Sequence, residues 1–592
     1  MEHRSEITLG SLLVGAVGVA RDLPQMARQL PGLANLRPGR RWTIGKQFAA
    51  TAAAHPNRPF LRSGAVTHTY GDCNRRANRW AAVLAERGVR RGDVVAIMAH
   101  NSADVVLAML ATVKLGAIAG MVNYNQTGEV LEHSLGLLST RVLLRDDACA
   151  EALTSVPDSA VPDAVLTFAD LDEAGDRLAA ADPRTNADPP VTASLRAGSP
   201  AFYIFTSGTT GWPKASIMSH SRWSLAMAGL GGASIRLRPD DVMYCALPMY
   251  HNNALTVALG AALGAGACLA IGEKFSASRF FDEIIANDAT AFCYIGELCR
   301  YLLAQPPKPS DRAHRVRVAV GNGLRPDIWD EFVERFAIPR VVEFYSASES
   351  NIGFVNVFAQ RNTVGFSPMP HAIVEVDVTT GEPIRDARGR VRRVAKGQPG
   401  LLLAHISPLA RLDGYTDADA TEKKIVRDAF LRGDAWFNTG DLVYSQGFGH
   451  IGFADRLGDT FRWKGENVAT TEVESVVNQV PGVVESVVYG VTVPGADGRA
   501  GMAAIVVDDG WGEQSWARLA TAVRDRLPAY AAPVFVRVVP EIEHTSTFKS
   551  RRVELREEGY DQVGDDEVRV FAEGAYVPRY PAFVEGLAVR RS

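Results

Sequence analysis

Residues 203–214 read Tyr-Ile-Phe-Thr-Ser-Gly-Thr-Thr-Gly-Trp-Pro-Lys. The segment opens with three bulky β-formers, Tyr203, Ile204 and Phe205, which predict the end of a buried strand. The loop that follows is rich in hydroxyls and glycines and ends at Lys214. Backbone N–H groups, hydroxyl donors and one cation in a small space can hold a polyphosphate, and glycine lets the backbone approach it closely. The segment therefore predicts a phosphate-binding loop.

The spacing of the glycines excludes a Walker P-loop. That motif has two glycines five residues apart, followed by Lys-Ser or Lys-Thr, whereas Gly208 and Gly211 are three apart and Ala215 follows Lys214. A short loop of this composition can also be an ordinary surface loop. The full string Thr-Ser-Gly-Thr-Thr-Gly-x-Pro-Lys is more specific, and it resembles the phosphate-binding signature of the adenylate-forming (AMP-binding) enzymes. The resemblance assigns ATP binding to Thr206, Ser207, Gly208, Thr209, Thr210, Gly211 and Lys214.

Length and composition indicate a multidomain globular protein. A chain of 592 residues exceeds what one hydrophobic core usually serves. Its net charge of −4 argues against a nucleic-acid binder that works by bulk charge. The cysteines form no C-x-x-C pair, so we expect buried free thiols in a reducing compartment, the cytoplasm, rather than disulfides or a zinc site. The six cysteines are Cys73, Cys149, Cys245, Cys268, Cys293 and Cys299.

The N-terminal segment, residues 1–42, is open to several interpretations. Ile7 to Ala20 is an uncharged, largely apolar run, and no apolar stretch in the chain reaches the ~20 residues that span a bilayer. A basic stretch follows the run: Arg21, Arg28, Arg37, Arg40 and Arg41. The run can pack on the protein as a helix, or it can make peripheral contact with the inner face of a membrane. A signal peptide is disfavoured because Glu2 and Glu6 dilute the basic flank that such a segment needs.

Strands and helices alternate over the next part of the chain. We expect helices at Asp72–Arg87 and Ala103–Leu115, the second capped by Ser102, with a buried strand at Asp93–Ala99 between them. The alternation continues with strands near 242–247, 267–271, 291–295 and 316–320 and helices near 254–264 and 278–287. This pattern predicts an α/β fold with mainly parallel sheets.

The pattern of predicted secondary structure changes twice toward the C-terminus. From about residue 366 to 460, turns separate short strands, which predicts an antiparallel or barrel-like β-rich subdomain. From about residue 457, helices and strands predict a small α+β domain. We therefore expect a large domain at 43–456, built of α/β subdomains and a β-rich subdomain, and a small mobile domain at 457–592.

Further motifs stand in the order that they have in the adenylate-forming enzymes. Leu247–His251 resembles the aromatic and histidine gate beside the acyl-carboxylate pocket, which assigns His251 a catalytic role. Glu343–Glu349 resembles the Tyr-Gly-x-Thr-Glu element, in which the aromatic residue stacks on adenine and the glutamate holds Mg²⁺ near the phosphates. The resemblance therefore places Tyr345 at the adenine and gives Glu349, with Thr206, to the metal, and oxygen ligands suit a hard cation.

The chain departs from this element at two positions. Ser346 stands where the family has glycine, and Ser348 stands where it has threonine. Ser348 keeps the hydroxyl, whereas Ser346 adds bulk beside the nucleotide and puts the local backbone shape in doubt. The resemblance assigns ATP contacts to Tyr345, Ser346, Ala347 and Ser348.

Shorter strings complete the nucleotide site. Gly321, Asn322 and Gly323 resemble the small-residue ledge under the adenine. Thr439-Gly440-Asp441 resembles the ribose-binding motif, and Arg456 is the second ribose contact that the resemblance implies. Each string alone would be an ordinary surface turn, but their order along the chain makes them support one another.

The C-terminal part carries the hinge and two functional loops. The family's interdomain hinge falls at Gly458 and Asp459, where glycine suits a large change in φ and ψ. Thr545–Lys549 resembles the loop with the catalytic lysine, which makes Lys549 both catalytic and ATP-binding. The segment that faces coenzyme A during thioester formation corresponds to Lys464, Gly465 and Glu466.

The resemblance covers roughly residues 46–555, and within the superfamily it narrows. Phe461-Arg462-Trp463-Lys464-Gly465-Glu466-Asn467 looks like the fatty acid transport protein and very-long-chain acyl-CoA synthetase family. This likeness implies a ligase that converts a fatty acid, ATP and coenzyme A, with Mg²⁺, to acyl-CoA, AMP and pyrophosphate through an acyl-adenylate. An acyl-AMP ligase that loads a separate carrier protein stays open as an alternative. A peptide-synthetase module is disfavoured because the 43 residues after Lys549 are too few for a carrier domain, and a membrane carrier lacks a spanning segment.

Overall fold

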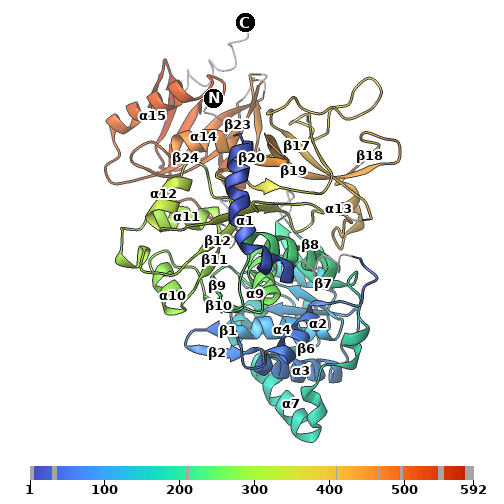
Figure 1. Ribbon diagram of the computed structural model, residues 1–592. Helices are drawn as coiled ribbons and strands as arrows, with labels where there is room; N and C mark the ends of the chain where they lie inside the picture. The colour runs from blue at the N-terminus through green and yellow to red at the C-terminus, as the bar shows by residue number, and fades with distance from the viewer. Residues whose placement is uncertain are drawn as a thin grey trace.

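The computed structural model describes residues 6–29, 37–207, 212–408, 410–464, 466–493, 496, 498–544 and 552–579. Figure 1 shows the large N-terminal part in blue, green and yellow, with the orange and red C-terminal part beside the β-rich region at the top. Six residues with predicted site roles lie outside the described residues: Gly208, Thr209, Thr210, Gly211, Gly465 and Lys549.

The first subdomain is built on a six-stranded sheet in the order β6-β5-β3-β4-β7-β8. All neighbouring strands pair in parallel except β7 and β8, which form an antiparallel pair around the predicted phosphate loop. The predicted strand–helix alternation is therefore confirmed here. The strands are β3 (Val94–Met98), β4 (Ile118–Met121), β5 (Val142–Arg145), β6 (Ala164–Thr167), β7 (Pro200–Ser207) and β8 (Pro213–Ser219), and the helices beside them include α3 (Tyr70–Glu86) and α4 (Ala103–Lys114).

The second sheet joins a parallel half to an antiparallel half. Strands β9 (Val242–Cys245), β10 (Cys268–Ile271), β11 (Ala291–Ile295), β12 (Val318–Asn322) and β13 (Val341–Ser346) pair in parallel. After β13 the pairing becomes antiparallel, through β14 (Gly353–Val355) and β15 (Gly365–Phe366) to β20 (His450–Arg456). The β-rich end also contains β16 (His371–Val374), β17 (Gly400–His405) and β19 (Ala435–Gly447), all antiparallel. The predicted β-rich subdomain is thus an antiparallel extension of the same sheet.

The C-terminal part has a sheet and a hydrophobic core of its own. Its five strands pair in the order β23-β24-β25-β26-β27, and its buried core residues run from Phe461 to Tyr576. The elements are β23 (Val483–Thr492), β24 (Arg499–Val507), β25 (Phe535–Val538), β26 (Val568–Ala572) and β27 (Ala575–Pro578), with helices α14 (Thr470–Val477), α15 (Glu513–Arg526) and α16 (Arg552–Glu558). A small α+β unit is confirmed; the boundary at 456/457 and the mobility of the unit stay predictions.

Two π-helices pack beside α9 (Leu259–Ala265). The predicted helix near 254–264 is in fact the π-helix η7 (Asn253–Ala258) followed by α9, and a second π-helix, η6 (Ala226–Ile235), packs against α9. Glycine allows this close approach, because a Cβ on Gly231 would lie 3.0 Å from Ala261 Cα. The Ser102 side chain also makes no capping hydrogen bond, in contrast to the prediction, although its backbone has the extended geometry of an N-cap.

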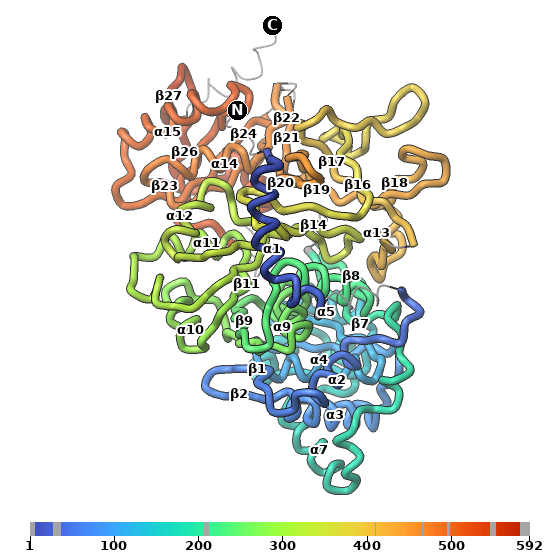
Figure 2. The backbone as a smooth tube through the Cα atoms, viewed as in Figure 1, coloured from blue at the N-terminus to red at the C-terminus, as the bar shows by residue number. Residues whose placement is uncertain are grey.

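The N-terminal run forms helix α1 (Leu9–Gln29), which packs on the protein. Figure 2 shows α1 crossing the front of the molecule between β20 and α9, and it contacts η6. The Ile7 backbone N–H donates to the Gln446 carbonyl at 2.9 Å, and the Arg236 guanidinium donates to Asp22 at 3.0 Å. Of the three interpretations of this run, packing on the protein is the one that the contacts support.

The outward face of α1 is apolar. Leu13, Val14 and Val17 are 61%, 76% and 56% exposed, and the exposed Arg21 follows them on the helix. Among the helices of the described ranges, none is both long enough and apolar enough to cross a membrane. The helix thus has a packed face and an exposed apolar face.

All six cysteines are buried and free, as predicted. Burial raises the pKa of Cys73 to about 12 and that of Cys268 to about 11, so these thiols stay protonated at neutral pH.

A pair of glycine substitutions tests how α1 is held. A Cβ on Gly15 would lie 2.5 Å from the Phe358 carbonyl oxygen, whereas a Cβ on Gly18 meets no heavy atom within 4 Å. We expect Gly15→Ala to loosen α1 and to speed tryptic cleavage after Arg21. The matched control Gly18→Ala should keep the wild-type cleavage rate and gain up to about 1 kcal/mol of helix stability. Equal cleavage of the two variants would contradict this packing.

Candidate active site

One large cavity collects most of the predicted site residues. It has a volume of about 3040 Å³ and is lined by segments of both sheets and of the C-terminal unit. The predicted residues among its lining are Thr206, Lys214, His251, Asn322, Gly323, Tyr345, Ser346, Ala347, Ser348, Glu349, Asp441, Arg456, Gly458 and Asp459. Gly321 lies buried in β12 directly behind this surface, where a Cβ would come within 2.3 Å of the Tyr294 carbonyl oxygen.

The strand pair around the phosphate loop brings a hydroxyl and a cation together, and a tyrosine near the cation is hydrogen-bonded to the Glu349 carboxylate. Thr206 lies opposite Lys214 in the β7–β8 pair, and Lys214 Nζ is 5.9 Å from the centre of the Tyr415 ring. Burial and the neighbouring Glu349 carboxylate, to which Tyr415 is hydrogen-bonded, raise the pKa of Tyr415. Thr206 and Glu349 both line the cavity, and this hydroxyl and carboxylate form a donor set that fits Mg²⁺.

A half-buried arginine to which no sequence motif assigns a role, Arg222, anchors the segment before and after Glu349. The Arg222 guanidinium donates to the carbonyls of Ser348 and Ser350 at 2.7 and 2.6 Å, and to the Ala347 carbonyl at 3.3 Å. Burial lowers the pKa of Arg222, which the carboxylates of Asp413 and Glu349 oppose. The signal was present in the sequence, because Arg222 stands three residues after the phosphate-loop strand, but a lone arginine carries no specific pattern.

The two serines that depart from the family pattern fit the local backbone. Ser346 ends strand β13, pairs with Gly353 and donates its hydroxyl to the Ile352 carbonyl at 3.1 Å. A residue in an extended strand needs no glycine, which removes the doubt about this position. Ser348 Oγ accepts from the Asn252 amide at 2.6 Å, so this hydroxyl is held in place.

The predicted ribose contacts are adjacent in space. Asp441 and Arg456 face each other across the β19–β20 pair, with 3.9 Å between Arg456 Nε and Asp441 Oδ1. The Tyr345 hydroxyl donates to Asp441 Oδ2 at 2.6 Å. Burial and the Asp441 carboxylate raise the pKa of Tyr345, so its hydroxyl remains a donor at neutral pH.

Glu343 holds the glycine ledge from behind. Its carboxylate accepts from the backbone N–H groups of Gly323 and Leu324, at 2.9 and 3.1 Å, and from the Tyr294 hydroxyl at 2.5 Å. Gly323 has φ of +87°, a conformation that favours glycine. Burial raises the pKa of Glu343 to about 8, although the three donors act in the opposite direction. No motif in the sequence assigns Glu343 a role.

The loop that carries His251 is tied to the first subdomain by one buried amide. Asn101 Nδ2 donates to the carbonyls of Leu247 and Gly272 at 2.9 and 3.1 Å, and Asn101 Oδ1 accepts from the Met249 N–H at 2.8 Å. The His251 ring lies 4.4 Å from the Tyr250 ring. Beyond His251 the cavity is bordered by small and apolar residues of the π-helices and their flanks: Leu225, Ala226, Gly229, Leu230, Ala233, Thr256 and Val257.

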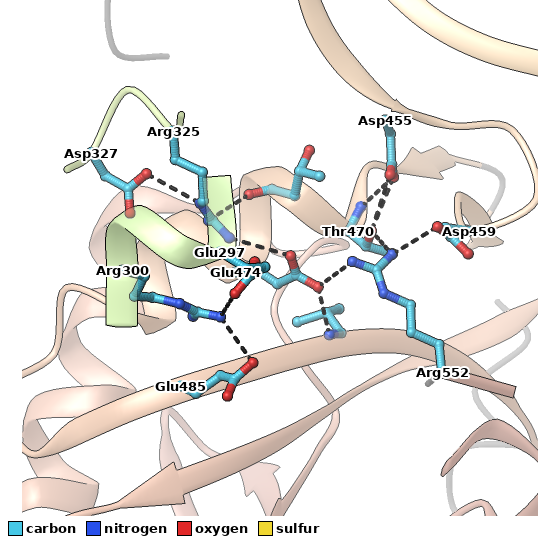
Figure 3. Close-up of polar contacts among 12 residues, drawn as sticks. Glu297, Arg300, Arg325, Asp327, Asp455, Asp459, Thr470, Glu474, Glu485 and Arg552 are labelled. Carbon is cyan, nitrogen blue, oxygen red and sulfur yellow. Dashed lines mark hydrogen bonds and ion pairs between the residues drawn. The ribbon is translucent and has the colours of Figure 1, made fainter. Parts of the chain in front are cut away.

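The junction of the two domains is rich in charges (Figure 3). Asp455 accepts from the Thr470 N–H at 2.6 Å and from the Thr460 hydroxyl at 3.0 Å, and burial raises its pKa to about 6. Gly458, at the predicted hinge, has no heavy atom within 4 Å of the place that a Cβ would take, so packing does not require glycine there.

The C-terminal unit turns its last helix toward the cavity. Arg552, three residues after Lys549, lines the cavity and pairs with Asp459 at 3.0 Å and Glu474 at 2.9 Å. Lys464 and Glu466 are exposed and do not line the cavity. The structure therefore brings Arg552 and helix α16 to the cavity and leaves Lys464 and Glu466 away from it.

Two family models match this chain. The model of the AMP-binding enzyme matches residues 48–404, and that of the AMP-binding enzyme C-terminal domain matches residues 472–549. The chain belongs to the AMP-binding enzyme family. This membership confirms the resemblance that the motifs indicated.

Curated relatives match nearly the whole chain. The medium/long-chain-fatty-acid–CoA ligase FadD6 of Mycobacterium tuberculosis (strain ATCC 25618 / H37Rv) is 54% identical over 97% of this chain and 96% of that protein. The long-chain fatty acid transport protein 2 of Rattus norvegicus is 40% identical over 91% of this chain and 89% of that protein. Residues 461–467 indicate the fatty acid transport protein and very-long-chain acyl-CoA synthetase family, and these relatives agree with that prediction.

Solved structures share the fold. ATP-bound MatB from Rhodopseudomonas palustris superposes with a TM-score of 0.72 at 23% identity, over 87% of this chain and 98% of that one. The anthranilate CoA ligase AuaEII in complex with anthranoyl-AMP gives 0.73 at 20% identity, over 87% and 97%. The predicted fold, a large α/β domain with a β-rich part and a small α+β domain, is confirmed as that of the adenylate-forming enzymes.

Glu343 should make stability depend on pH. Its folded pKa of about 8 lies above the ordinary value of 4.5, so the folded state binds the proton more tightly. The stability gained this way is fully present below pH 4.5 and is lost as the pH rises through 8. Denaturant unfolding at pH 5, 6.5 and 8.5 should therefore show a free energy of unfolding that falls more steeply in the wild type than in Glu343→Gln. The exposed control Glu331→Gln should follow the wild type, and parallel curves for all three proteins would contradict the prediction.

Proposed function

We propose that this protein is an ATP-dependent fatty acid–CoA ligase that forms a fatty acyl-adenylate and then the acyl-CoA thioester. The observation that carries the proposal is the large cavity, whose lining includes Thr206 and Lys214 from the strands of the phosphate loop, the ribose pair Asp441 and Arg456, His251, and the small and apolar residues of η6 and its flanks. The full-length similarity to a medium/long-chain-fatty-acid–CoA ligase supports the same substrate class.

In the first half-reaction, a carboxylate oxygen of the fatty acid attacks the α-phosphorus of ATP, and the bond to the pyrophosphate leaving group breaks. Positioning and electrostatics supply most of the catalysis, because negative charge builds on the phosphoryl oxygens. Lys214 and Lys549 provide positive charge to the phosphates, and His251 borders the fatty carboxylate. Mg²⁺ held by Thr206 and Glu349 would neutralise further phosphate charge.

In the second half-reaction, the thiol of coenzyme A attacks the acyl carbonyl carbon and AMP leaves. The predicted coenzyme A segment must reach the cavity for this step, and in the structure Lys464 and Glu466 lie away from it. We infer a rotation of the small domain about Gly458 and Asp459 between the two steps, which withdraws the Lys549 loop and brings Lys464, Gly465 and Glu466 in.

We propose that the acyl chain lies along the part of the cavity that η6 and η7 line. Ala226, Gly229 and Ala233 recur along one side of η6 and line the cavity with little side-chain volume. Small residues leave room for an extended apolar chain, and burial of each methylene favours binding by about 0.8 kcal/mol. A long-chain or very-long-chain fatty acid is therefore the proposed substrate.

An acyl-length series tests the proposal against a carrier-loading acyl-AMP ligase. The protein is incubated with Mg²⁺, ATP and saturated acids of increasing length, with and without coenzyme A, and AMP and thioester are measured. We expect stoichiometric AMP and acyl-CoA when coenzyme A is present. Lys549→Ala should lower pyrophosphate release by about 10²–10³-fold, because it removes a charge positioned at the transition state.

The exposed Lys423→Ala serves as the control for this substitution and should retain wild-type rates. Adenylate that accumulates without any thioester would reject the CoA ligase in favour of the carrier-loading alternative. Pyrophosphate release at the wild-type rate in Lys549→Ala would reject the assignment of the catalytic lysine.

We also propose that the outward face of α1 makes peripheral contact with an anionic membrane. The exposed Leu13, Val14 and Val17 form the apolar part, and the exposed Arg21 adds a positive charge beside them. Apolar burial together with attraction to anionic headgroups gives reversible surface binding, with about 1 kcal/mol for each basic residue near the surface. Fatty acids partition into bilayers, so an enzyme on that surface would meet its substrate there.

Vesicle sedimentation tests this contact. The double variant Leu13→Glu with Val17→Glu should bind phosphatidylserine-containing vesicles much less than the wild type, and raised salt should weaken wild-type binding. The control pair Val66→Glu with Leu431→Glu changes two equally exposed positions elsewhere and should leave sedimentation unchanged. Turnover of a water-soluble medium-chain acid should persist in both. Equal sedimentation of all three proteins would leave α1 as a packing helix only.

A further inference from the structure

Two ion pairs cross the junction between the large and the small domain. Arg300, on α11 (Gly296–Leu303), pairs with Glu485 of β23 at 2.8 Å. Arg325, which follows β12, pairs with Glu474 of α14 at 3.5 Å and also donates to the Thr471 carbonyl at 3.4 Å. Figure 3 shows both arginines pointing from the large domain to these glutamates.

These pairs are shielded from water. The side chains of Glu474 and Glu485 are 5% and 10% exposed, and those of Arg300 and Arg325 are 14% and 20% exposed. Burial alone would lower the pKa of Arg300, but the carboxylates of Glu297 and Glu485 raise it above its ordinary value. Such pairs contribute more than exposed surface pairs do, and salt screens them less.

Each charge in the two pairs has a second partner within its own domain. Arg300 also binds Glu297 at 2.5 Å, and Arg325 also binds Asp327 at 3.2 Å. On the other side, Glu485 contacts His544 at 3.2 Å, and Glu474 binds Arg552 at 2.9 Å and accepts from the Val488 N–H. Breaking a buried ion pair is usually costly because it leaves a buried charge without a partner. Separation of the domains would avoid this cost, because each of the four charges keeps a partner in its own domain.

We propose that Arg300–Glu485 and Arg325–Glu474 form a reversible latch that holds the small domain in the orientation for adenylation. The inference rests on the proposed function, in which the domain rotates between the two half-reactions. In the latched orientation α16 lines the cavity and Lys464 lies away from it. Both ion pairs must open before the small domain can rotate to bring Lys464 to the cavity in place of α16. Arg300 and Arg325 are positioning residues, since neither touches the reacting atoms in this account.

The half-reactions can be measured separately. Adenylation is followed as pyrophosphate release in a single turnover without coenzyme A, and thioester formation as conversion of supplied acyl-adenylate by coenzyme A. The double variant Arg300→Gln with Arg325→Gln should slow adenylation roughly tenfold, because it removes two contacts that favour that orientation. Conversion of supplied acyl-adenylate should stay at the wild-type rate or rise.

Three controls separate positioning from loss of structure. Arg300→Lys with Arg325→Lys keeps both charges and should restore most of the adenylation rate. Arg361→Gln removes an exposed ion pair with Asp330 in the same domain and should change neither half-reaction. A double-mutant cycle of Arg300→Gln with Glu485→Gln should show that the two effects on adenylation are not additive.

The outcomes are distinct. Equal slowing of both half-reactions, equal rates in the lysine and glutamine variants, or no change in any variant would overturn the latch. If the double variant unfolds at a lower temperature than the wild type, the two single variants are used instead. The ratio of the adenylation rate to the thioester-formation rate then tests the latch in each of them. Wild-type protein that makes adenylate but no thioester with coenzyme A would instead reject the proposed function.

Discussion

The guanidinium of Arg222 joins the two halves of the candidate site. Arg222 follows the strand of the phosphate loop in the first sheet, and its donors reach the carbonyls of Ala347, Ser348 and Ser350, which extend from the second sheet. Strand β8 also forms a β-bridge from Ser216 to Tyr415, and the Ser216 hydroxyl donates to the Ser348 carbonyl. The relative position of Thr206 and Glu349, the proposed metal ligands, therefore depends on Arg222 together with these contacts of Ser216.

Much of the fold could be predicted because its signals are local. Alternating strands and helices, glycine stops and the run of short strands after residue 366 each reflect the conformational preferences of nearby residues. The π-helices could not be predicted in this way. In η6 the backbone widens where Gly231 lies against Ala261, and a contact between residues 30 positions apart leaves no periodic mark in the sequence.

The residues of the candidate site also divide into those with a local sequence signal and those that depend on long-range contacts. The residues proposed to contact the nucleotide are arranged in short motifs, so Tyr345, Asp441 and Arg456 could be predicted from the sequence, and the structure brings these three side chains together. The residues that hold those motifs in place, such as Glu343 behind the glycine ledge and Asn101 behind the His251 loop, act through single long-range hydrogen bonds. A lone glutamate or asparagine has no distinctive neighbours, and only the tertiary structure reveals its partner.

The domain junction combines contacts of two kinds. The charges of the proposed latch each retain a partner in their own domain. Opening the latch therefore costs less free energy than breaking a buried ion pair whose charges have no other partner. Asp455 differs, because its bonds from Thr460 and Thr470 come from beyond the predicted hinge at Gly458, whereas its bond from the Arg456 N–H comes from before it. The proposed rotation would have to replace the two threonine donors with water or with new donors, because a buried carboxylate without donors is costly. The Arg456 donor precedes the hinge and can stay in place. Asp455 therefore adds a resistance of its own, beside the hinge, to that of the latch.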